Sequence, residues 1–302
     1  MPVKGIRLFK IFGITVFLHW SWLLVAAYEL ETRRNRYLSM GWNIAEYLAL
    51  FAIVLMHEFG HALACRSVGG TADRIVLWPL GGVAYVNPPS RPGAVLWSIV
   101  AGPLVNVALL PLSIWFTSLP IDSDLNRFLY SVGIINVVLL VFNVLPIYPL
   151  DGGKILWALL WFVMGKGRAL MVASGIGIAG TATLGILALY SGNTWLVIIA
   201  LWTGFMAFSG FKYAQELRRR ELLPRRSGPK CPTCGSAPPV GPFWVCPGCK
   251  GRFDAFEFPV ECPACHRPLR NITCPDCGGG APPSAWGVAT PPPAAQARVV
   301  PL

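Results

Sequence analysis

Charged residues are scarce in this chain of 302 residues, at 13% of the total, which is about half the fraction usual in soluble proteins. Hydrophobic residues make up 54%, and apolar runs of roughly 20 residues, the length that crosses a bilayer, recur through its first two-thirds. A cleaved secretory signal would account for one such run but not for several. The composition excludes an ordinary soluble domain and predicts an all-α polytopic membrane protein with about six transmembrane helices.

The predicted transmembrane helices are the apolar runs at about residues 11–30, 41–65, 94–118, 128–146, 169–191 and 194–213. One more apolar piece, 153–164, is too short to span the bilayer. Between the second and third runs, β-branched residues flank the stretch from Pro79 to Gly82, which predicts a short β-hairpin or a re-entrant loop. Such a hairpin could offer its edge to an extended substrate, or it could be a plain connector.

The chain has few acidic residues to balance its basic ones, and its net charge is +11. Much of the positive charge follows the last apolar run, in Lys212, Arg218, Arg219, Arg220, Arg225, Arg226 and Lys230. This position is typical of the cytoplasmic flank of a membrane helix, so we predict contact with the lipid bilayer and no specific nucleic acid. The lysines and arginines of the other loops favour both termini in the cytoplasm, although Arg33, Arg34 and Arg36 oppose that bias.

Cysteine is almost absent from the apolar part, where Cys65 stands alone. The other cysteines form four Cys-x-x-Cys pairs, Cys231/Cys234, Cys246/Cys249, Cys262/Cys265 and Cys274/Cys277. This spacing is typical of zinc knuckles in a reducing compartment and not of a disulfide framework. Two knuckles close one tetrahedral thiolate site, so the pairs predict a double zinc ribbon with two structural Zn²⁺ ions. The simplest pairing joins neighbouring knuckles, across gaps of 11 and 8 residues.

The predicted domains are a membrane domain at 1–217, a basic linker at 218–229, the double zinc ribbon at 230–280 and a disordered Pro/Ala-rich tail at 281–302. Four thiolates leave no open position on a zinc ion, so the ribbon should not be catalytic. It could recruit a protein partner, contact nucleic acid or gate the membrane domain.

The second run contains the motif HEFGH. On a helix His57 and His61 lie one turn apart on the same face, as a single zinc ion requires. Glu58 is rotated away from that pair and is predicted to act as a general base on water. Ionisable residues inside an apolar span are costly, and this makes a functional site more plausible than a chance motif.

A catalytic zinc usually has three protein ligands, and Asp151 is the best candidate for the third. With the N-terminus inside, the second and fourth runs both end on the inner side, so Asp151 would lie at the depth of the histidines. Gly152 and Gly153 would permit a close approach of the backbone. The alternative is that Asp151 caps the helix predicted over 153–164.

HEFGH in an early span, followed by NVLPIYPLDGG after a later one, resembles the site-2 protease family of intramembrane zinc metalloproteases, particularly its compact bacterial members. AGPLVN and GITVFLHWSWLL resemble the same family, and the similarity covers about residues 5–217. It implies one catalytic Zn²⁺ on His57, His61 and Asp151, with Glu58 as the base. It also implies cleavage of membrane protein substrates within or near their transmembrane segments, in regulated proteolysis, and a bacterial cell membrane as the location.

The resemblance also implicates Asn143 at the active site, where its amide could donate to the developing oxyanion or hold the substrate backbone. An ordinary interhelical hydrogen bond is the alternative. Asn106 is expected to join spans, and His19 either to face the zinc cavity or to pack as a hydrogen-bonded histidine. A non-proteolytic scaffold that recruits partners through its zinc ribbon is a competing hypothesis. A metal transporter is a weaker one, because the spans offer a single ligand cluster.

Overall fold

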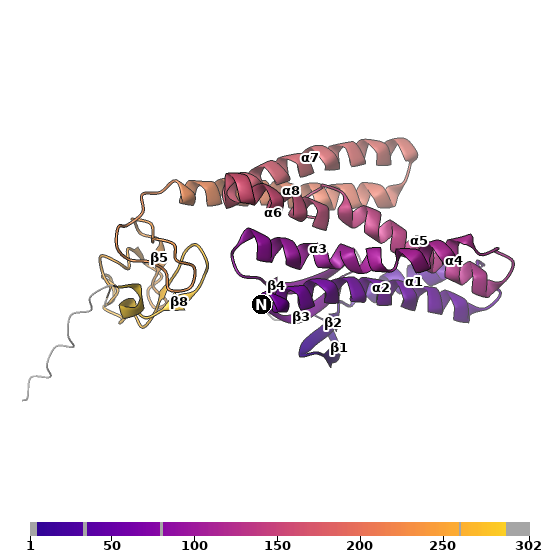
Figure 1. Cartoon of the computed structure of the whole chain (residues 1–302), viewed down its shortest axis with the longest axis horizontal. Helices are drawn as coiled ribbons and strands as arrows, with labels where there is room; N and C mark the ends of the chain where they lie inside the picture. The colour runs from indigo at the N-terminus through magenta and orange to yellow at the C-terminus, as the bar shows by residue number, and fades with distance from the viewer. Residues whose placement is uncertain (1–4, 33–34, 79–80, 260, 288–302) are drawn as a thin grey trace, which may run out of the picture. The chain divides into compact units, whose positions relative to one another are not determined.

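The computed structural model describes residues 5–32, 35–78, 81–259 and 261–287, and these fall into two compact units (Figure 1). The first unit, Met1–Arg218, is called the helical unit here. The second, Arg219–Leu302, is called the C-terminal module.

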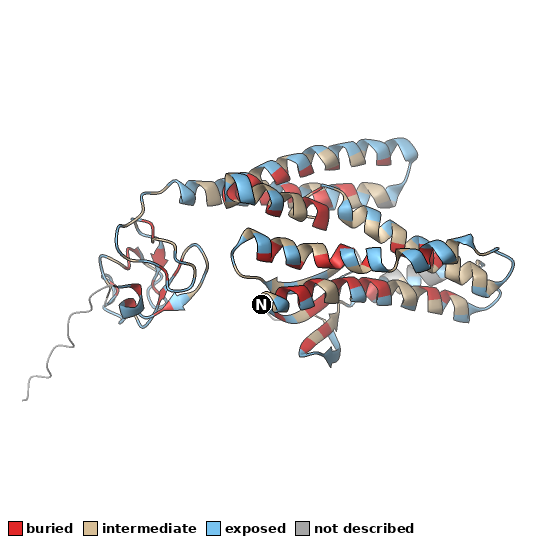
Figure 2. Cartoon of the chain, in the orientation of Figure 1, coloured by how far each residue is buried: buried red, intermediate tan, exposed pale blue. Residues whose placement is uncertain are grey.

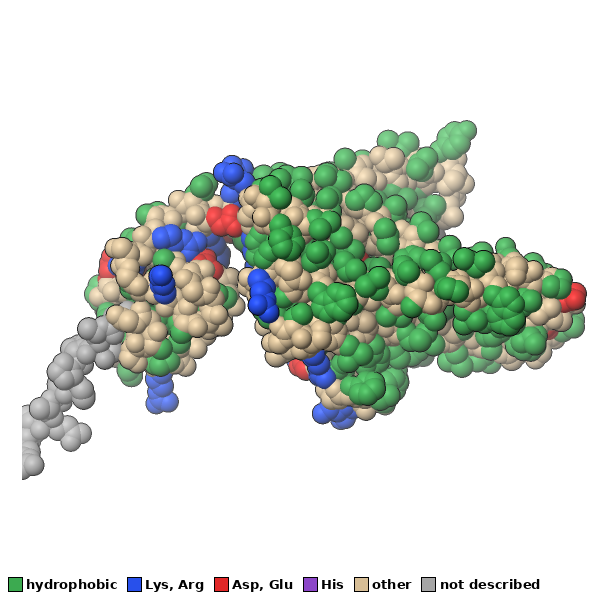
Figure 3. Space-filling model, viewed as in Figure 1, with side chains coloured by type: hydrophobic (Ala, Val, Ile, Leu, Met, Phe, Trp, Pro, Cys, Tyr) green, Lys and Arg blue, Asp and Glu red, His purple; other side chains and the backbone are tan. Residues whose placement is uncertain are grey.

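The described helices are α1 (Ser21–Thr32), α2 (Met40–Ser67), α3 (Pro92–Ala108), α4 (Leu110–Ser118), α5 (Asp124–Val144), α6 (Asp151–Met164), α7 (Lys166–Ser191) and α8 (Thr194–Glu221). Five helical stretches among the described residues are long and apolar enough to cross a membrane, namely Met40–Ser67, Pro92–Ser118, Asp124–Val144, Lys166–Ser191 and Leu196–Glu221. They contain or largely overlap the last five predicted runs. Hydrophobic side chains cover much of the visible surface of these helices, as a lipid-facing surface requires (Figure 3).

The first predicted span is not a single helix. Its sequence forms β2 (Ile14–Leu18) and then the 12-residue helix α1. A helix of this length is about 18 Å long, short of the roughly 30 Å hydrocarbon core. The β-branched and aromatic residues of ITVFL favour a strand, and the alternate residues Ile14 and Val16 form its completely buried face. The hydrophobic run correctly indicated burial, but its pattern changes from that of a strand in β2 to that of a helix in α1.

A four-stranded sheet has the order β1-β2-β3-β4, with β1 (Ile6–Ile11), β3 (Thr71–Trp78) and β4 (Gly81–Asn87). β1 pairs antiparallel with β2, β2 runs parallel to β3, and β3 and β4 form the predicted hairpin with Trp78 opposite Gly81. The hairpin tip at residues 79–80 lies outside the described residues. The sequence prediction missed that the N-terminal residues extend this hairpin into a sheet.

The core of the helical unit lies between this sheet and α2. Ile14, Val16, Ile75 and Leu77 are buried against helix residues that include Val54. Buried residues also run along α2 and α3 (Figure 2), and they include polar ones, namely Asn43, Glu46, His57, Glu58 and His61 in α2 and Ser98 and Asn106 in α3. The sheet and α3 therefore enclose α2, the helix that carries HEFGH.

The C-terminal module is built from four turns of the same kind. In each, the amide of the residue after the second cysteine donates to the carbonyl of the first cysteine, as from Gly235 to Cys231 and from Lys250 to Cys246. The residue after the second cysteine has a positive φ in every turn, in Gly235, Lys250, His266 and Gly278. This left-handed residue lets the chain reverse so that the two thiols of a pair point to one side.

Two predicted boundaries of the module are wrong. Residues 281–287 were expected to be disordered, but β8 (Gly280–Ala281) pairs with β7 (Ile272–Thr273) and is followed by the 3₁₀ helix η1 (Pro283–Trp286). Trp286 is 1% exposed because its ring packs against Phe256. Nor is 218–229 a plain linker, because α8 extends to Glu221 and the following arginines belong to the module. Arg226 donates to Asp254, which is buried, at 2.5 Å.

Candidate metal centres

α2 brings the two histidines of HEFGH together inside the helical unit. They lie one turn apart, with their Nε2 atoms separated by 3.1 Å. His57 is 5% exposed and His61 is 8% exposed, although most of their helix is apolar. A helix is enough to explain why the two histidines lie on the same face, but it does not explain why they are buried. Their burial comes from the sheet on one side of α2 and α3 on the other.

Asp151 reaches the histidines from α6. Its Oδ2 lies 3.0 Å from Nε2 of His57 and 3.1 Å from Nε2 of His61. The alternative role is excluded, since the N-cap of α6 is Leu150 and the first turn has no side-chain cap hydrogen bond. Gly152 makes this approach possible, because a Cβ there would lie 2.1 Å from the carbonyl oxygen of Val144.

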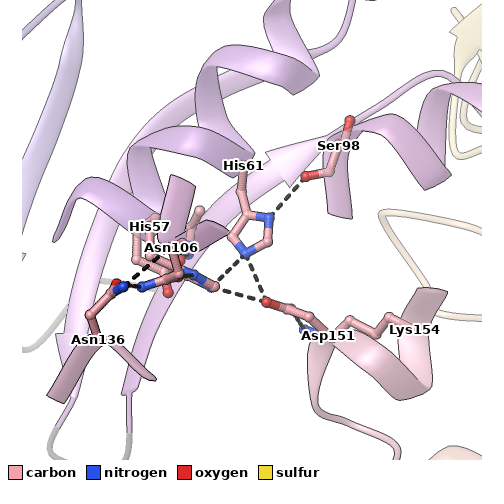
Figure 4. Close-up of polar contacts among 9 residues, drawn as sticks. His57, His61, Ser98, Asn106, Asn136, Asp151 and Lys154 are labelled. Carbon is pink, nitrogen blue, oxygen red and sulfur yellow. Dashed lines mark hydrogen bonds and ion pairs between the residues drawn. The ribbon is translucent and has the colours of Figure 1, made fainter. Parts of the chain in front are cut away.

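The other ring nitrogen of each histidine has an acceptor. Nδ1 of His57 donates to Oδ1 of Asn106 at 2.6 Å, and Nδ1 of His61 donates to the carbonyl of Ser98 at 2.9 Å (Figure 4). Asn106 is held in turn, because its amide donates to Oδ1 of Asn136 at 2.8 Å. With the proton on Nδ1, both Nε2 lone pairs point toward the Asp151 carboxylate.

The three donor atoms fit a metal ion. Three electron-rich atoms that face one point repel each other unless a cation lies between them. They are 3.0 to 3.1 Å apart, whereas tetrahedral bonds of about 2.0 Å to zinc would put them about 3.3 Å apart. Gly102 of α3 lines this space, because a Cβ there would lie 2.3 Å from Nε2 of His61. Oδ1 of Asp151 faces Lys154 at 3.6 Å, which leaves Oδ2 for the histidines.

Glu58 lies against the sheet beside the histidines. Its Oε2 accepts a hydrogen bond from the amide of Ala84 in β4 at 2.9 Å. A Cβ on Gly82 would come within 2.5 Å of Oε1, so glycine in this strand makes room for the carboxylate. A donor atom from each of His57, Glu58 and His61 lies within 4.8 Å of the others.

Two other candidate residues, Asn143 and His19, form no hydrogen bond with the metal-ligand cluster in the described part of the chain. Asn143 is half-buried near the end of α5, and its side chain makes no hydrogen bond to any residue that the structure describes. His19 packs as a hydrogen-bonded histidine, stacked on Trp78 with ring centroids 3.9 Å apart. The sequence prediction missed Asn136 and the support that Asn106 gives to His57. A polar side chain in the middle of an apolar span is the signal that could have found Asn136.

The eight cysteines form two clusters with a nested arrangement. Cys231 and Cys234 lie with Cys274 and Cys277, while Cys246 and Cys249 lie with Cys262 and Cys265. The predicted pairing of neighbouring knuckles is therefore wrong. The first knuckle packs against the fourth, where a Cβ on Gly279 would lie 2.7 Å from Oγ1 of Thr233. Each knuckle is a local turn, but which two knuckles meet depends on how the turns pack around the core of the module.

Both clusters fit zinc. The Sγ atoms of Cys231 and Cys277 are 3.7 Å apart, and those of Cys246 and Cys265 are 3.6 Å apart. Tetrahedral Zn–S bonds of about 2.3 Å would put the sulfurs about 3.8 Å apart. The backbone amides of Cys249 and Gly248 lower the pKa of Cys246 to about 6, which favours the thiolate that binds metal.

Comparison with known proteins assigns the helical unit to a family. The model of peptidase family M50 matches residues 45–120 and 111–187. A zinc metalloprotease of Methanocaldococcus jannaschii is 33% identical over 67% of this chain and 59% of its own length. A protein of Synechocystis sp., provisionally named as a zinc metalloprotease, is 31% identical over 73% of this chain and 63% of its own length. The chain thus spans about three-fifths of the length of these curated relatives.

A solved structure agrees with these matches. The site-2 protease from Methanocaldococcus jannaschii superposes with a TM-score of 0.50 at 27% identity, over 68% of this chain and 95% of that one. The matched regions contain HEFGH and PLDGG, the two segments that meet in the metal-ligand cluster. Together with the apolar helices, these similarities identify a membrane-embedded protein. The chain belongs to peptidase family M50.

Proposed function

We propose that this protein is an intramembrane zinc metalloendopeptidase that hydrolyses peptide bonds within or near the transmembrane segments of other membrane proteins, in regulated proteolysis. The observation that carries the proposal is the convergence of His57, His61 and Asp151 between apolar helices, with Glu58 beside them. Three ligands leave the fourth tetrahedral position open, which distinguishes catalytic from structural zinc sites.

In this proposal His57, His61 and Asp151 hold the catalytic zinc. When bound, zinc supplies a Lewis acid that makes water acidic near neutral pH and polarises a carbonyl. Asn106 fixes the ring of His57, and the carbonyl of Ser98 fixes that of His61, so both Nε2 atoms keep their direction. Lys154 holds the other oxygen of Asp151, which favours a single-oxygen contact with the metal.

Glu58 is the general base. The amide of Ala84 holds its Oε2, so Oε1 is the oxygen that accepts the proton from water and later gives it to the leaving amine. The hydrogen bond to β4 restricts the carboxylate to one orientation. Asn143 is proposed to donate to the oxyanion, as the resemblance implies. Its half-buried position near the end of α5, a few residues before Asp151, is compatible with that role.

Two further zinc ions are proposed in the C-terminal module, one on each group of four cysteines. They have a structural role, because four thiolates leave no position for water. The protein would therefore hold three zinc ions, one catalytic and two structural.

Both termini are proposed to face the cytoplasm from a bacterial cell membrane. The shortness of α1 does not change the side of the membrane on which the N-terminus is proposed to lie. Arg66, near the end of α2, donates to the carbonyl of Phe12, while Trp22 packs on Phe51 and Tyr37 donates to Glu46. The segment from β2 to α2 thus follows α2 back toward its start, as the first predicted span would. Lysine and arginine flank the proposed inner ends.

The test is Glu58→Gln, with Glu257→Gln as the matched change at an exposed position of the module. We expect cleavage to fall by about 10²- to 10⁴-fold in Glu58→Gln, with three zinc ions retained, and to be unchanged in Glu257→Gln. The measurement compares the membrane proteomes of cells that express each form. Uncleaved substrates should accumulate in the cells that express Glu58→Gln. If no membrane protein responds to Glu58→Gln, the scaffold hypothesis replaces the protease.

A further inference from the structure

The C-terminal module contains a groove that neither the proposed catalysis nor the zinc clusters use. It has a volume of about 780 Å³ and is lined by Arg220, Phe243, Trp244, Val245, Pro247, Phe253, Ala255, Arg267, Pro268, Leu269, Arg270, Asn271, Thr273 and Pro275. None of the eight cysteines lines it. Its walls come from β5 (Trp244–Val245), β6 (Arg252–Phe253), β7 and the segment 267–271, so the fold of the two zinc knuckle pairs determines its shape.

The charge of the groove has one sign. Its lining includes Arg220, Arg267 and Arg270 and no aspartate or glutamate. Four acidic residues of the module contact groups outside the lining, since Asp276 pairs with Arg225, Asp254 and Glu257 pair with Arg226, and Glu261 contacts His266. Arg267 and Arg270 form no ion pair with any residue in the described part of the chain. The groove is therefore complementary to an anion.

The uncharged part of the lining is largely apolar, and two-thirds of its apolar residues are aliphatic or proline. Val245 is 54% exposed and Phe243 is 36% exposed, and Leu269 and three prolines lie beside them. Trp244 is only 7% exposed, and its indole N–H donates to the carbonyl of Thr273 at 2.9 Å. Its ring is thus part of the core and offers little face for a stacked base. Aliphatic side chains between arginines fit the side chains of a peptide better than nucleobases.

We propose that this groove binds an acidic, extended segment of a protein partner. Carboxylates of the segment pair with Arg267 and Arg270, and its apolar side chains lie on Val245 and Leu269. The chain's own residues 288–302 do not supply these carboxylates, because they contain arginine and no aspartate or glutamate. Arg220, in the last turn of α8, adds a third positive charge to the lining.

The experiment measures binding to the full-length protein in detergent, as the Glu58→Gln form so that no probe is cleaved. The probe is a short fluorescein-labelled peptide that alternates glutamate with leucine, followed by fluorescence anisotropy. We expect the double variant Arg267→Gln/Arg270→Gln to raise the Kd by about tenfold or more for each lost charge-assisted pair. Thr273→Glu, which adds a carboxylate to the groove, should weaken binding in the same direction.

The matched control is Arg252→Gln/Lys230→Gln, which removes the same charge at positions that do not line the groove. It should change the Kd less than about twofold, and all variants should keep their zinc. An equal loss in the control, or equal binding of the peptide with glutamine in place of glutamate, would overturn the proposal. Stronger binding of a single-stranded oligonucleotide or of anionic phospholipid vesicles would also overturn it. These results do not test the protease activity, because the groove variants change the C-terminal module and the proposed catalytic residues lie in the helical unit.

Discussion

In the helical unit the proposed zinc ligands are His57 and His61 on α2 and Asp151 on α6, which are 94 and 90 residues apart in sequence. In the C-terminal module, each pair of thiols comes from a single turn of the chain. The first cluster needs the packing of two helices and leaves a ligand position open. Each cysteine cluster needs only two local turns that pack against each other, and it leaves no ligand position open. In the proposed function, the open position would make hydrolysis possible, and the closed sites would stabilise a module that has a small core.

The largest effect is expected from removing a ligand of the open site. Asp151→Ala should release the catalytic zinc. Loss of a residue that only supports a metal ligand costs up to about 100-fold, so loss of the ligand itself should reduce cleavage by more than that. The two other zinc ions should stay. Asp73→Ala, the same change at an exposed site paired with Arg74, should have no such effect. Metal analysis and a cleavage assay measure both, and loss of all three zinc ions would show that the two regions are not independent.

The nested pairing is tested by zinc content. Cys231→Ser with Cys277→Ser removes ligands of one cluster, so the protein should keep two of the proposed three zinc ions. Cys231→Ser with Cys246→Ser removes one ligand from each cluster and should leave only the catalytic ion. Pairing of neighbouring knuckles would give the reverse result. Both variants should unfold part of the module, because structural zinc supplies much of the folding free energy of such domains.

A smaller effect is expected from closing the space beside the histidines. Gly102→Ala would put a methyl group 2.3 Å from Nε2 of His61, so α3 or the ring must shift, at a cost of about 1 to 3 kcal/mol. We expect weaker zinc binding at the open site and lower activity. Gly175→Ala, where nothing lies within 4 Å, is the matched control and should be neutral or slightly stabilising. Normal zinc binding by Gly102→Ala would contradict the close packing of α3 on the site.

The smallest effects should come from the asparagines behind His57. Asn106→Ala removes the acceptor of Nδ1 and should weaken the binding of the catalytic zinc by about 10- to 100-fold. Asn136→Ala acts through Asn106 and should cost less. Asn126→Ala, at a half-buried position near the start of α5, where the side chain donates to Asp122, is the control. Competition with a chelator measures these affinities, and an equal effect of the two buried changes would mean that both asparagines support the helices and not the ring.

Much of the fold was predictable because hydrophobic runs and breaks are local signals. Five of the predicted runs form helices that are long and apolar enough to cross a membrane, and the β3–β4 hairpin is confirmed. The first run was misread, since a continuous apolar stretch has the same composition whether it becomes a strand, a helix or both. The disorder expected at residues 281–287 was also wrong, because a Pro/Ala-rich composition does not reveal that Trp286 packs on Phe256.

The sequence by itself determined the chemistry of the two metal-binding regions. HEFGH spaces two histidines by one helical turn, and each Cys-x-x-Cys turn needs only its own residues, so both follow from local geometry. Only the tertiary structure decided which groups meet. It brought Asp151 to the histidines, placed Asn106 and Asn136 behind His57, and joined the first knuckle to the fourth. These contacts depend on how distant elements pack, and several packings can satisfy the same local pattern.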